Sequence, residues 1–275
     1  MHPDVKRQLR KFLDEDVGNG DVTSALLTRK TIKANIITRE NGIIAGVKFV
    51  KMLFEMNSCK VKILKKDGDV IKADQQLISI TGDARKIMSC ERTALNLLAR
   101  MSGIATQTHS MVCKIPNKTK LYATRKTAPG LRYFDKIAVE IGGGYRHRMK
   151  LDEMIMIKDN HIISEGSLFT LIKKAKIHRK KFEVEVESIK DAVTAAKEGA
   201  DIIMLDNFTP YQIKKTIQEL KRQKLRHNII LEASGGINSR NIAKYGKTGV
   251  DIISVGSITN SVKGIDVSLE ITPAD

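Results

Sequence analysis

Positively charged side chains and glycines are gathered in one stretch of the sequence, from Thr124 to His161. Its fixed charges and titratable donors are Arg125, Lys126, Arg132, Arg146, His147, Arg148, Lys158 and His161. The glycines 142–144 and the turn Pro129-Gly130 let backbone amides come close to a ligand, because glycine has no side chain to block the approach. A solvated basic face does not need such glycines. The stretch therefore predicts an anion-binding site.

Acidic side chains form a second group farther along the chain. Glu183, Glu185 and Glu187 alternate along one predicted strand, and Asp206 ends the next. Alternate residues of a strand share one face, so we expect the glutamates to point inward among the cations and at least one of them to be functional. Carboxylates near a phosphate suit ribose hydroxyls or a divalent cation such as Mg²⁺. The pattern predicts that Glu185 and Asp206 flank the site.

Two glycine-containing loops follow later predicted strands. Glu232 and Ser234-Gly235-Gly236 come after one strand, and Gly256-Ser257 comes after the next. In α/β barrels, phosphate is commonly held at the last loops by backbone amides and helix N-termini. These paired loops predict phosphate binding. Together with the acids and cations, they indicate an enzyme that binds a phosphorylated sugar beside another anion.

The elements that must position these residues alternate between strand and helix from Leu121 onward. The predicted strands are residues 121–124, 154–157, 182–186, 202–205, 229–231 and 252–255, with helices such as 189–198 and 210–222 between them. Such alternation predicts parallel strands with crossover helices. About six strands are fewer than the eight of a complete barrel, so residues 104–262 are predicted to form an incomplete α/β barrel catalytic domain. A polar group ends each of these strands, so we expect these polar groups to lie together at one mouth of the barrel.

The N-terminal region has a different pattern. Residues 1–103 are predicted to form an α+β sandwich domain, with an amphipathic helix near 5–13 and strands near 33–38, 60–64 and 76–80. After Gly264 the alternation of apolar residues predicts one last strand within 263–275. This strand is expected to leave the barrel and complete the first domain's sheet.

Composition narrows the partners of the chain. A net charge of +17 over 275 residues attracts anions, including nucleic acids, membrane surfaces and phosphorylated metabolites. Without tryptophan, and with only 4% aromatic residues, stacking platforms for nucleic-acid strands are scarce. A basic nucleic-acid-binding protein stays as an alternative, and it predicts strongly salt-dependent binding.

Cysteine use and hydropathy indicate the compartment. Cys59, Cys90 and Cys113 are widely separated and odd in number, so neither a disulfide framework nor a zinc site is indicated. A reduced, cytoplasmic setting is the simplest interpretation. No apolar run approaches the length of a spanning helix, so no membrane partner is expected.

The motifs together resemble the quinolinate phosphoribosyltransferase family, whose members are also called carboxylating nicotinate-nucleotide pyrophosphorylases. The resemblance spans nearly the whole chain in order, through Glu91-Arg92-Thr93-Ala94-Leu95-Asn96, Thr124-Arg125-Lys126-Thr127, Pro129-Gly130-Leu131-Arg132, Gly142-Gly143-Gly144, His147-Arg148, Ile157-Lys158-Asp159-Asn160-His161, Glu183-Val184-Glu185-Val186-Glu187, Leu205-Asp206-Asn207 and Ser234-Gly235-Gly236. One departure is Tyr145-Arg146, where the family pattern has a small residue and asparagine.

The resemblance implies a reaction and a set of partners. Phosphoribose would pass from phosphoribosyl pyrophosphate to the ring nitrogen of quinolinate, with loss of CO₂ and pyrophosphate, giving nicotinate mononucleotide for NAD synthesis. It also implies Mg²⁺ as cofactor and a homodimer or higher homo-oligomer, in which Arg92 of one subunit completes the partner's site.

The resemblance also assigns roles residue by residue. Quinolinate would be bound by Arg92, Arg125, His147, Arg148 and Lys158. Phosphoribosyl pyrophosphate would be bound by Lys126, Glu185 and Asp206, which are also the expected catalytic residues, and by the loop residues Ser234, Gly235, Gly236, Gly256 and Ser257. The metal would be held by Glu185 and Asp206, directly or through water.

Other interpretations stay open for single residues and for the whole chain. Arg92 could be a helix-surface arginine, Lys158 a solvated lysine, and His147 a donor that fixes its loop without touching substrate. His161 and Arg132 are expected to pack loops rather than contact ligand. A related protein of molybdate-transport operons shares the fold, but Lys126-Thr127 and the segment 158–161 favour the quinolinate enzyme.

Overall fold

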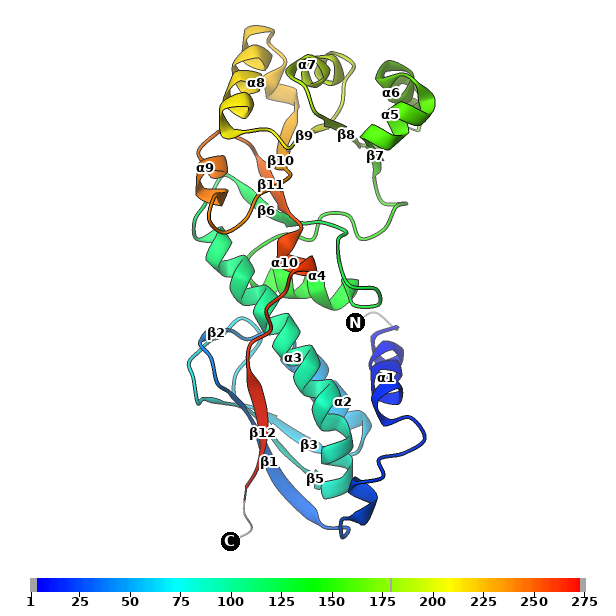
Figure 1. Cartoon of the computed structure of the whole chain (residues 1–275), viewed down its shortest axis with the longest axis vertical. Coiled ribbons are helices and arrows are strands. Elements are labelled where there is room, and N and C mark those ends of the chain that lie inside the picture. The colour runs from blue at the N-terminus through cyan, green and yellow to red at the C-terminus, as the bar shows by residue number, and fades with distance from the viewer. Residues whose placement is uncertain (1–3, 179, 273–275) are drawn as a thin grey trace. The chain divides into compact units, whose positions relative to one another are not determined.

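The computed structural model describes residues 4–178 and 180–272, and the chain divides into two compact units (Figure 1). One unit contains the residues up to Gln107 together with those from Val262 onward, and the other is Thr108–Ser261. The long helix α3 (Ala84–Val112) begins in the first unit and ends in the second.

The first unit is built on an antiparallel sheet with the strand order β12-β1-β5-β3. Its elements are α1 (Asp4–Val17), the short 3-10 helix η1 (Ser24–Leu26), β1 (Thr31–Thr38), β2 (Gly42–Ile43), α2 (Val47–Met56), β3 (Lys60–Ile63), β4 (Val70–Ile71), β5 (Gln76–Asp83) and β12 (Val267–Thr272). Strand β12 pairs with β1, with Val267 opposite Thr38 and Thr272 opposite Lys33. The last strand therefore lies in this sheet; residues 273–275, the end of its predicted range, lie outside the described residues.

The alternation of apolar residues explains the core of the first unit. Ala34 and Ile36 of β1 are fully buried, whereas Lys33, which precedes Ala34 in the strand, is exposed. Helix α2 adds Phe49 and Leu53, which are also fully buried. Each of the larger side chains, Ile36, Phe49 and Leu53, stabilises the fold by about 1.5–3 kcal/mol when it is removed from water. The two-residue period of the strand thus gives the sheet one apolar and one polar face.

The second unit contains a six-stranded sheet with the order β6-β11-β10-β9-β8-β7, and every neighbouring pair is parallel. The strands are β6 (Lys120–Ala123), β7 (Ile155–Ile157), β8 (Phe182–Val186), β9 (Ile202–Asp206), β10 (Ile230–Ser234) and β11 (Ile252–Val255). Among the described residues β6 and β7 are the two edges, so the sheet does not close. The predicted incomplete barrel of about six parallel strands is confirmed.

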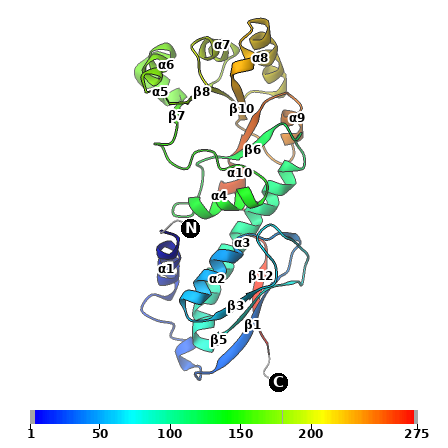
Figure 2. The same ribbon diagram turned by 180° about the vertical axis from the view of Figure 1, so that it is seen from behind.

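The helices of the second unit connect successive strands. They are α4 (Arg132–Ile141), α5 (Asp159–Glu165), α6 (Leu168–Ile177), α7 (Ile189–Lys197), α8 (Pro210–Arg222), η2 (Arg226–Asn228), α9 (Ile242–Gly246) and α10 (Ser257–Asn260). Figures 1 and 2 show α5 to α8 along one side of the strands β7 to β10.

Helix α8 shows why these segments become helical. The Thr209 hydroxyl caps the helix by accepting from the Gln212 amide, and Pro210 occupies the first turn, where its missing N–H costs nothing. Ile213 and Leu220 are buried at helical spacing. Local signals and burial agree, and the predicted range 210–222 matches the helix.

Candidate active site

The ends of the parallel strands meet in one cavity of the second unit, with a volume of about 380 Å³. Its lining residues are Ala123, Thr124, Arg125, Lys126, His147, Arg148, Met156, Lys158, Glu185, Met204, Asp206, Glu232, Ser234 and Ser254. The strands β7 to β11 supply half of these lining residues, and where a strand supplies two, they are alternate residues. The intervening residues, such as Val184, Leu205 and Ala233, are buried on the other face of the sheet.

Eight of the predicted site residues line this cavity together. They are Arg125, Lys126, His147, Arg148, Lys158, Glu185, Asp206 and Ser234. The loop residues Gly235, Gly236, Gly256 and Ser257 are not among the lining residues. Arg92 lies on α3 in the first unit, where its side chain is exposed.

Lys158 and Glu185, both of which line the cavity, form an ion pair between Lys158 Nζ and Glu185 Oε2. The Lys158 amide N–H donates to His161 Nδ1 at 3.0 Å and so begins helix α5. His161 therefore fixes the loop, as the sequence predicts. Arg132 also packs a loop, because its guanidinium donates to the Met149 carbonyl at 3.1 Å.

Two arginines give the cavity its anion-binding character. The Arg148 guanidinium donates to the Met154 carbonyl at 3.1 Å, and burial and the nearby Arg125 lower the Arg148 pKa. The Nε of Arg125 is buried and has no hydrogen-bond partner among the described residues. A buried N–H of a charged group is costly to leave unpaired, so this donor favours an anionic ligand in the cavity.

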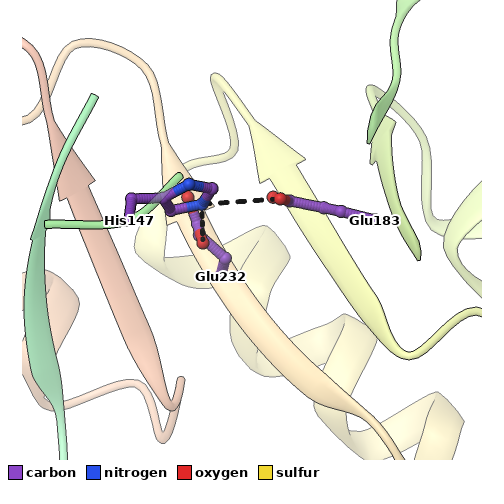
Figure 3. Close-up of side chains that lie close together, drawn as sticks. All are labelled: His147, Glu183 and Glu232. Carbon is purple, nitrogen blue, oxygen red and sulfur yellow. Dashed lines mark ion pairs between the residues drawn. The ribbon is translucent and has the colours of Figure 1, made fainter. Parts of the chain in front are cut away.

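His147 adopts a left-handed backbone conformation with φ of +54°, which is uncommon for a residue other than glycine. Its Nε2 lies 3.4 Å from Glu232 Oε2 and 3.5 Å from Glu183 Oε2, and Figure 3 shows the two carboxylates approaching the ring from different strands. The Arg148 amide N–H donates to Nδ1 at 2.8 Å. Both ring nitrogens of His147 are therefore engaged within the protein.

The His147 cluster, defined as His147, Glu183 and Glu232, holds its protons tightly. Burial lowers the pKa of His147, but the two carboxylates outweigh it and raise the pKa to about 9. Burial and the charge of Glu232 raise the pKa of Glu183. At neutral pH the cluster thus carries one proton more than a neutral imidazole beside two carboxylates. Because Nδ1 accepts the Arg148 N–H, the imidazole's own proton lies on Nε2, and the extra proton lies on the carboxylates that face it.

The same three residues have a spacing that would suit a metal ion, since one ligand atom from each lies within 4.8 Å of the others. A histidine that binds metal through Nε2 carries its proton on Nδ1 and donates it to a neighbour. Here Nδ1 accepts a hydrogen bond instead. The geometry therefore favours a proton-holding cluster over a metal centre.

The departure at residues 145 and 146 is accommodated away from the histidine. The Tyr145 ring stacks on Tyr122 with ring centres 5.2 Å apart, and Arg146 pairs with Glu140. The edge of the His147 ring meets Tyr122 at 5.6 Å. These contacts add packing around the loop, and Arg146 stays outside the cavity lining.

Sequence reasoning placed Glu232 at the end of its strand and did not identify Lys136. Glu232 is buried in the middle of β10 rather than at its end, and Lys136 is buried within α4. The available signal was a charge inside an apolar run, as in Ile229-Ile230-Leu231-Glu232-Ala233. Such a charge needs partners, but the sequence does not say which.

An incomplete α/β barrel with cations and carboxylates at its mouth defines an enzyme for anionic, phosphorylated substrates. Two family models match the chain: "Quinolinate phosphoribosyl transferase, N-terminal domain" over residues 21–102 and "Quinolinate phosphoribosyl transferase, C-terminal domain" over 104–270. The chain belongs to the quinolinate phosphoribosyl transferase family. It is therefore a phosphoribosyltransferase of NAD biosynthesis.

Individual relatives agree with this assignment. The chain is 46% identical to a probable nicotinate-nucleotide pyrophosphorylase (carboxylating) of Methanothermobacter thermautotrophicus, with 96% of this chain and 97% of the relative covered. It is 35% identical to the corresponding protein of Dictyostelium discoideum, covering 97% of this chain and 95% of the relative. The crystal structure of the nicotinate-nucleotide pyrophosphorylase from Ehrlichia chaffeensis superposes with a TM-score of 0.93 at 35% identity, covering 99% and 100% of the two chains.

Two further observations bear on the setting of the enzyme. Among the described residues, no helix combines the length and the apolar character needed to span a membrane. Cys59, Cys90 and Cys113 are all free thiols, and the first two are buried. Burial raises the pKa of Cys90 to about 12, so its thiol stays protonated.

Proposed function

We propose that the cavity of the second unit carries out the family's reaction with two separate halves. One half binds the two carboxylates of quinolinate, and the other binds phosphoribosyl pyrophosphate. The observation that carries this proposal is the composition of one cavity, in which Arg125, Arg148 and Lys158 stand beside Lys126 and two carboxylates. Quinolinate is a dianion, so adjacent guanidinium and ammonium groups match its charge.

The quinolinate half consists of Arg125, Arg148 and Lys158. The unpartnered Nε of Arg125 supplies a donor for one carboxylate, and Arg148 supplies donors for the second. His147 supports this half through its loop, because its two nitrogens are already engaged by the Arg148 amide and the glutamates. This geometry favours the loop-fixing role over direct contact with substrate.

The phosphoribosyl half consists of Lys126, Glu185, Asp206 and Ser234, with the loops 235–236 and 256–257 beside it. A side chain at Gly256 would place its Cβ 3.2 Å from Lys126 Cδ, so the glycine gives Lys126 room at the cavity. Glu185 and Asp206 offer carboxylate oxygens, the donors that Mg²⁺ prefers, and both line the cavity. These two residues would hold Mg²⁺, directly or through water, and the ion would neutralise charge on the departing pyrophosphate.

The reaction needs positioning and charge stabilisation more than an activated nucleophile. The lone pair of the pyridine nitrogen forms the bond to ribose C1, and the electrons of the broken C–O bond leave with pyrophosphate. Glu185 and Asp206 stabilise positive charge at C1, while Lys126 stabilises the leaving group. The new pyridinium then withdraws electrons, CO₂ leaves, and a proton takes its place at C2.

The assembly and location proposed for the enzyme follow from the family. We place it in the cytoplasm as a homodimer or larger homo-oligomer, with Arg92 of one subunit completing the partner's quinolinate half. An exposed arginine on α3 has no evident function within its own unit, which agrees with a role across an interface.

Product analysis tests the proposed reaction directly. Purified protein mixed with quinolinate, phosphoribosyl pyrophosphate and Mg²⁺ should give nicotinate mononucleotide and CO₂ in equal amounts, and chelation of Mg²⁺ should stop both. Release of pyrophosphate without CO₂ would reject the decarboxylating reaction. Absence of any product with quinolinate would favour a different acceptor, as expected for the relative linked to molybdate transport.

A further inference from the structure

A fully buried lysine lies next to the candidate active site. Lys136, within α4, has no exposed surface. Its Nζ donates hydrogen bonds to two main-chain carbonyls, those of Arg146 and Arg148, the second at 2.7 Å. Lysine is almost never fully buried, because its ammonium group loses hydration. Because burial of the ammonium group costs free energy, we expect the hydrogen bonds of Lys136 to these carbonyls to have a function.

The two carbonyls lie on either side of His147, whose φ is +54°. A residue with a side chain is disfavoured in this conformation and keeps it only where surrounding groups hold it there. Lys136 binds the residue before and the residue after, so one ammonium group bridges the disfavoured turn. Glu183 and Glu232 face the ring of the same residue and hold it in place.

The loop leads straight into the quinolinate half of the cavity. Arg148 lines the cavity, and its carbonyl is one of the two that Lys136 binds. Its amide N–H is fixed by His147 Nδ1 at 2.8 Å. Because its carbonyl and its amide are both hydrogen-bonded, the main chain of Arg148 is fixed before any ligand binds.

We propose that Lys136 is a positioning residue for quinolinate: its bonds to the carbonyls of residues 146 and 148 hold the loop so that the Arg148 guanidinium is ready to bind a carboxylate. The proposal rests on the proposed division of the cavity into two halves. It adds a residue that touches neither substrate and that acts through the main chain of its neighbours.

Electrostatics add a second, measurable link. Burial, together with the charges of Arg132, Arg125 and Arg148, lowers the pKa of Lys136 to about 8, and Glu153 opposes this shift. A dianion bound among these arginines favours the charged ammonium and so raises this pKa. Quinolinate binding near pH 8 should therefore take up a proton, and affinity should fall as pH rises above about 8.

The kinetic test compares Lys136→Met with Lys150→Met, a lysine that is exposed only two residues beyond Arg148. Methionine has similar length but cannot bridge the carbonyls. The KM for quinolinate should rise at least about tenfold in Lys136→Met, since small misplacements of binding groups cost this much or more, while the KM for phosphoribosyl pyrophosphate stays within about twofold. Lys150→Met should match the wild type. Equal rises in both KM values, or no rise for quinolinate, would overturn the proposal.

Two further measurements separate positioning from simple loss of structure. The melting temperature of Lys136→Met should fall only slightly, because the variant loses two hydrogen bonds to carbonyls but no longer buries an ammonium group. A large fall in melting temperature together with unchanged quinolinate affinity would show a purely structural lysine and overturn the proposal.

Calorimetry of quinolinate binding at pH 8, in HEPES and in Tris buffer, should give an uptake of up to about half a proton per site in the wild type and almost none in Lys136→Met. Equal uptake in both proteins would contradict the electrostatic link. Failure of the wild type to bind quinolinate at all would instead refute the proposed function, so the two failures are distinguishable.

Discussion

Replacement of Arg148 by alanine tests the division of the cavity. The guanidinium lines the cavity with its stem half-buried and donates to the Met154 carbonyl. A full charge pair at hydrogen-bond distance contributes about 4–5 kcal/mol at an effective dielectric constant of about 20. Arg125 and Lys158 stay in the same cavity and recover part of this loss. We therefore expect a net loss of about 2–4 kcal/mol in quinolinate binding, or about 30-fold to about 1,000-fold in Kd.

The assay is calorimetric titration of each substrate separately into wild-type and variant protein. Phosphoribosyl pyrophosphate should bind Arg148→Ala within a few-fold of the wild type, because its half of the cavity contains Lys126, Glu185 and Asp206. Arg146→Ala is the matched control. Its guanidinium pairs with Glu140 and does not line the cavity, so quinolinate affinity should stay within about twofold.

The outcome that refutes the reasoning is equal weakening of both ligands by Arg148→Ala. The positive charges of the cavity would then attract both ligands without separate binding halves. A loss confined to phosphoribosyl pyrophosphate would reverse the two halves. Nicotinate supplies a second check with the unaltered protein, because it lacks one carboxylate and should bind as poorly to the wild type as quinolinate binds to Arg148→Ala.

Two other predictions concern the His147 cluster and the subunit interface. The raised pKa of His147, about 9, means that the cluster adds stability below pH 6.5, its ordinary value, and loses it as pH rises to about 9. Glu232→Gln should flatten this fall in melting temperature. The measurement is the difference in melting temperature between variant and wild type over pH 6–8, because above about pH 8 the lowered pKa of Lys136 makes stability rise with pH instead. An unchanged slope of melting temperature against pH would argue against the proton-holding cluster. Arg92→Ala and Lys126→Ala should each be nearly inactive alone, yet mixed and reassembled subunits should regain part of the activity, because some dimers then hold one intact site. No recovery despite demonstrated subunit exchange would place both residues in one subunit's site.

Much of this site could be predicted from the sequence because parallel strands impose a simple rule. The carboxyl ends of such strands lie at one edge, so polar residues that follow apolar runs must gather there. Lys158, Glu185 and Asp206 follow this rule, and all three line the cavity. Strand boundaries were less certain: β10 was expected to end at residue 231 and continues to Ser234. A glutamate that follows an apolar run looks in the sequence like the end of a strand, because its buried partner cannot be seen there.

The residues that could not be predicted are those whose partners are distant in the chain. Nothing local indicates that Glu183 and Glu232 meet the ring of His147, or that Lys136 bridges a turn formed by a histidine with positive φ. That turn is energetically disfavoured for its sequence, and only the closed fold supplies the groups that hold it. Functional geometry of this kind is visible only after the strands are assembled.

The assembled strands also explain how the enzyme tolerates so many cations in one cavity. Arg125, Lys126, Arg148 and Lys158 repel one another when no substrate is bound. The counter-charges are Glu183, Glu185, Asp206 and Glu232, and all four come from alternate positions of β8, β9 and β10. The same two-residue period that buries Val184, Leu205 and Leu231 on one face of the sheet places these carboxylates on the other. A strand pattern that builds the barrel thus also supplies the negative charge that keeps an anion-binding cavity intact before its substrates arrive.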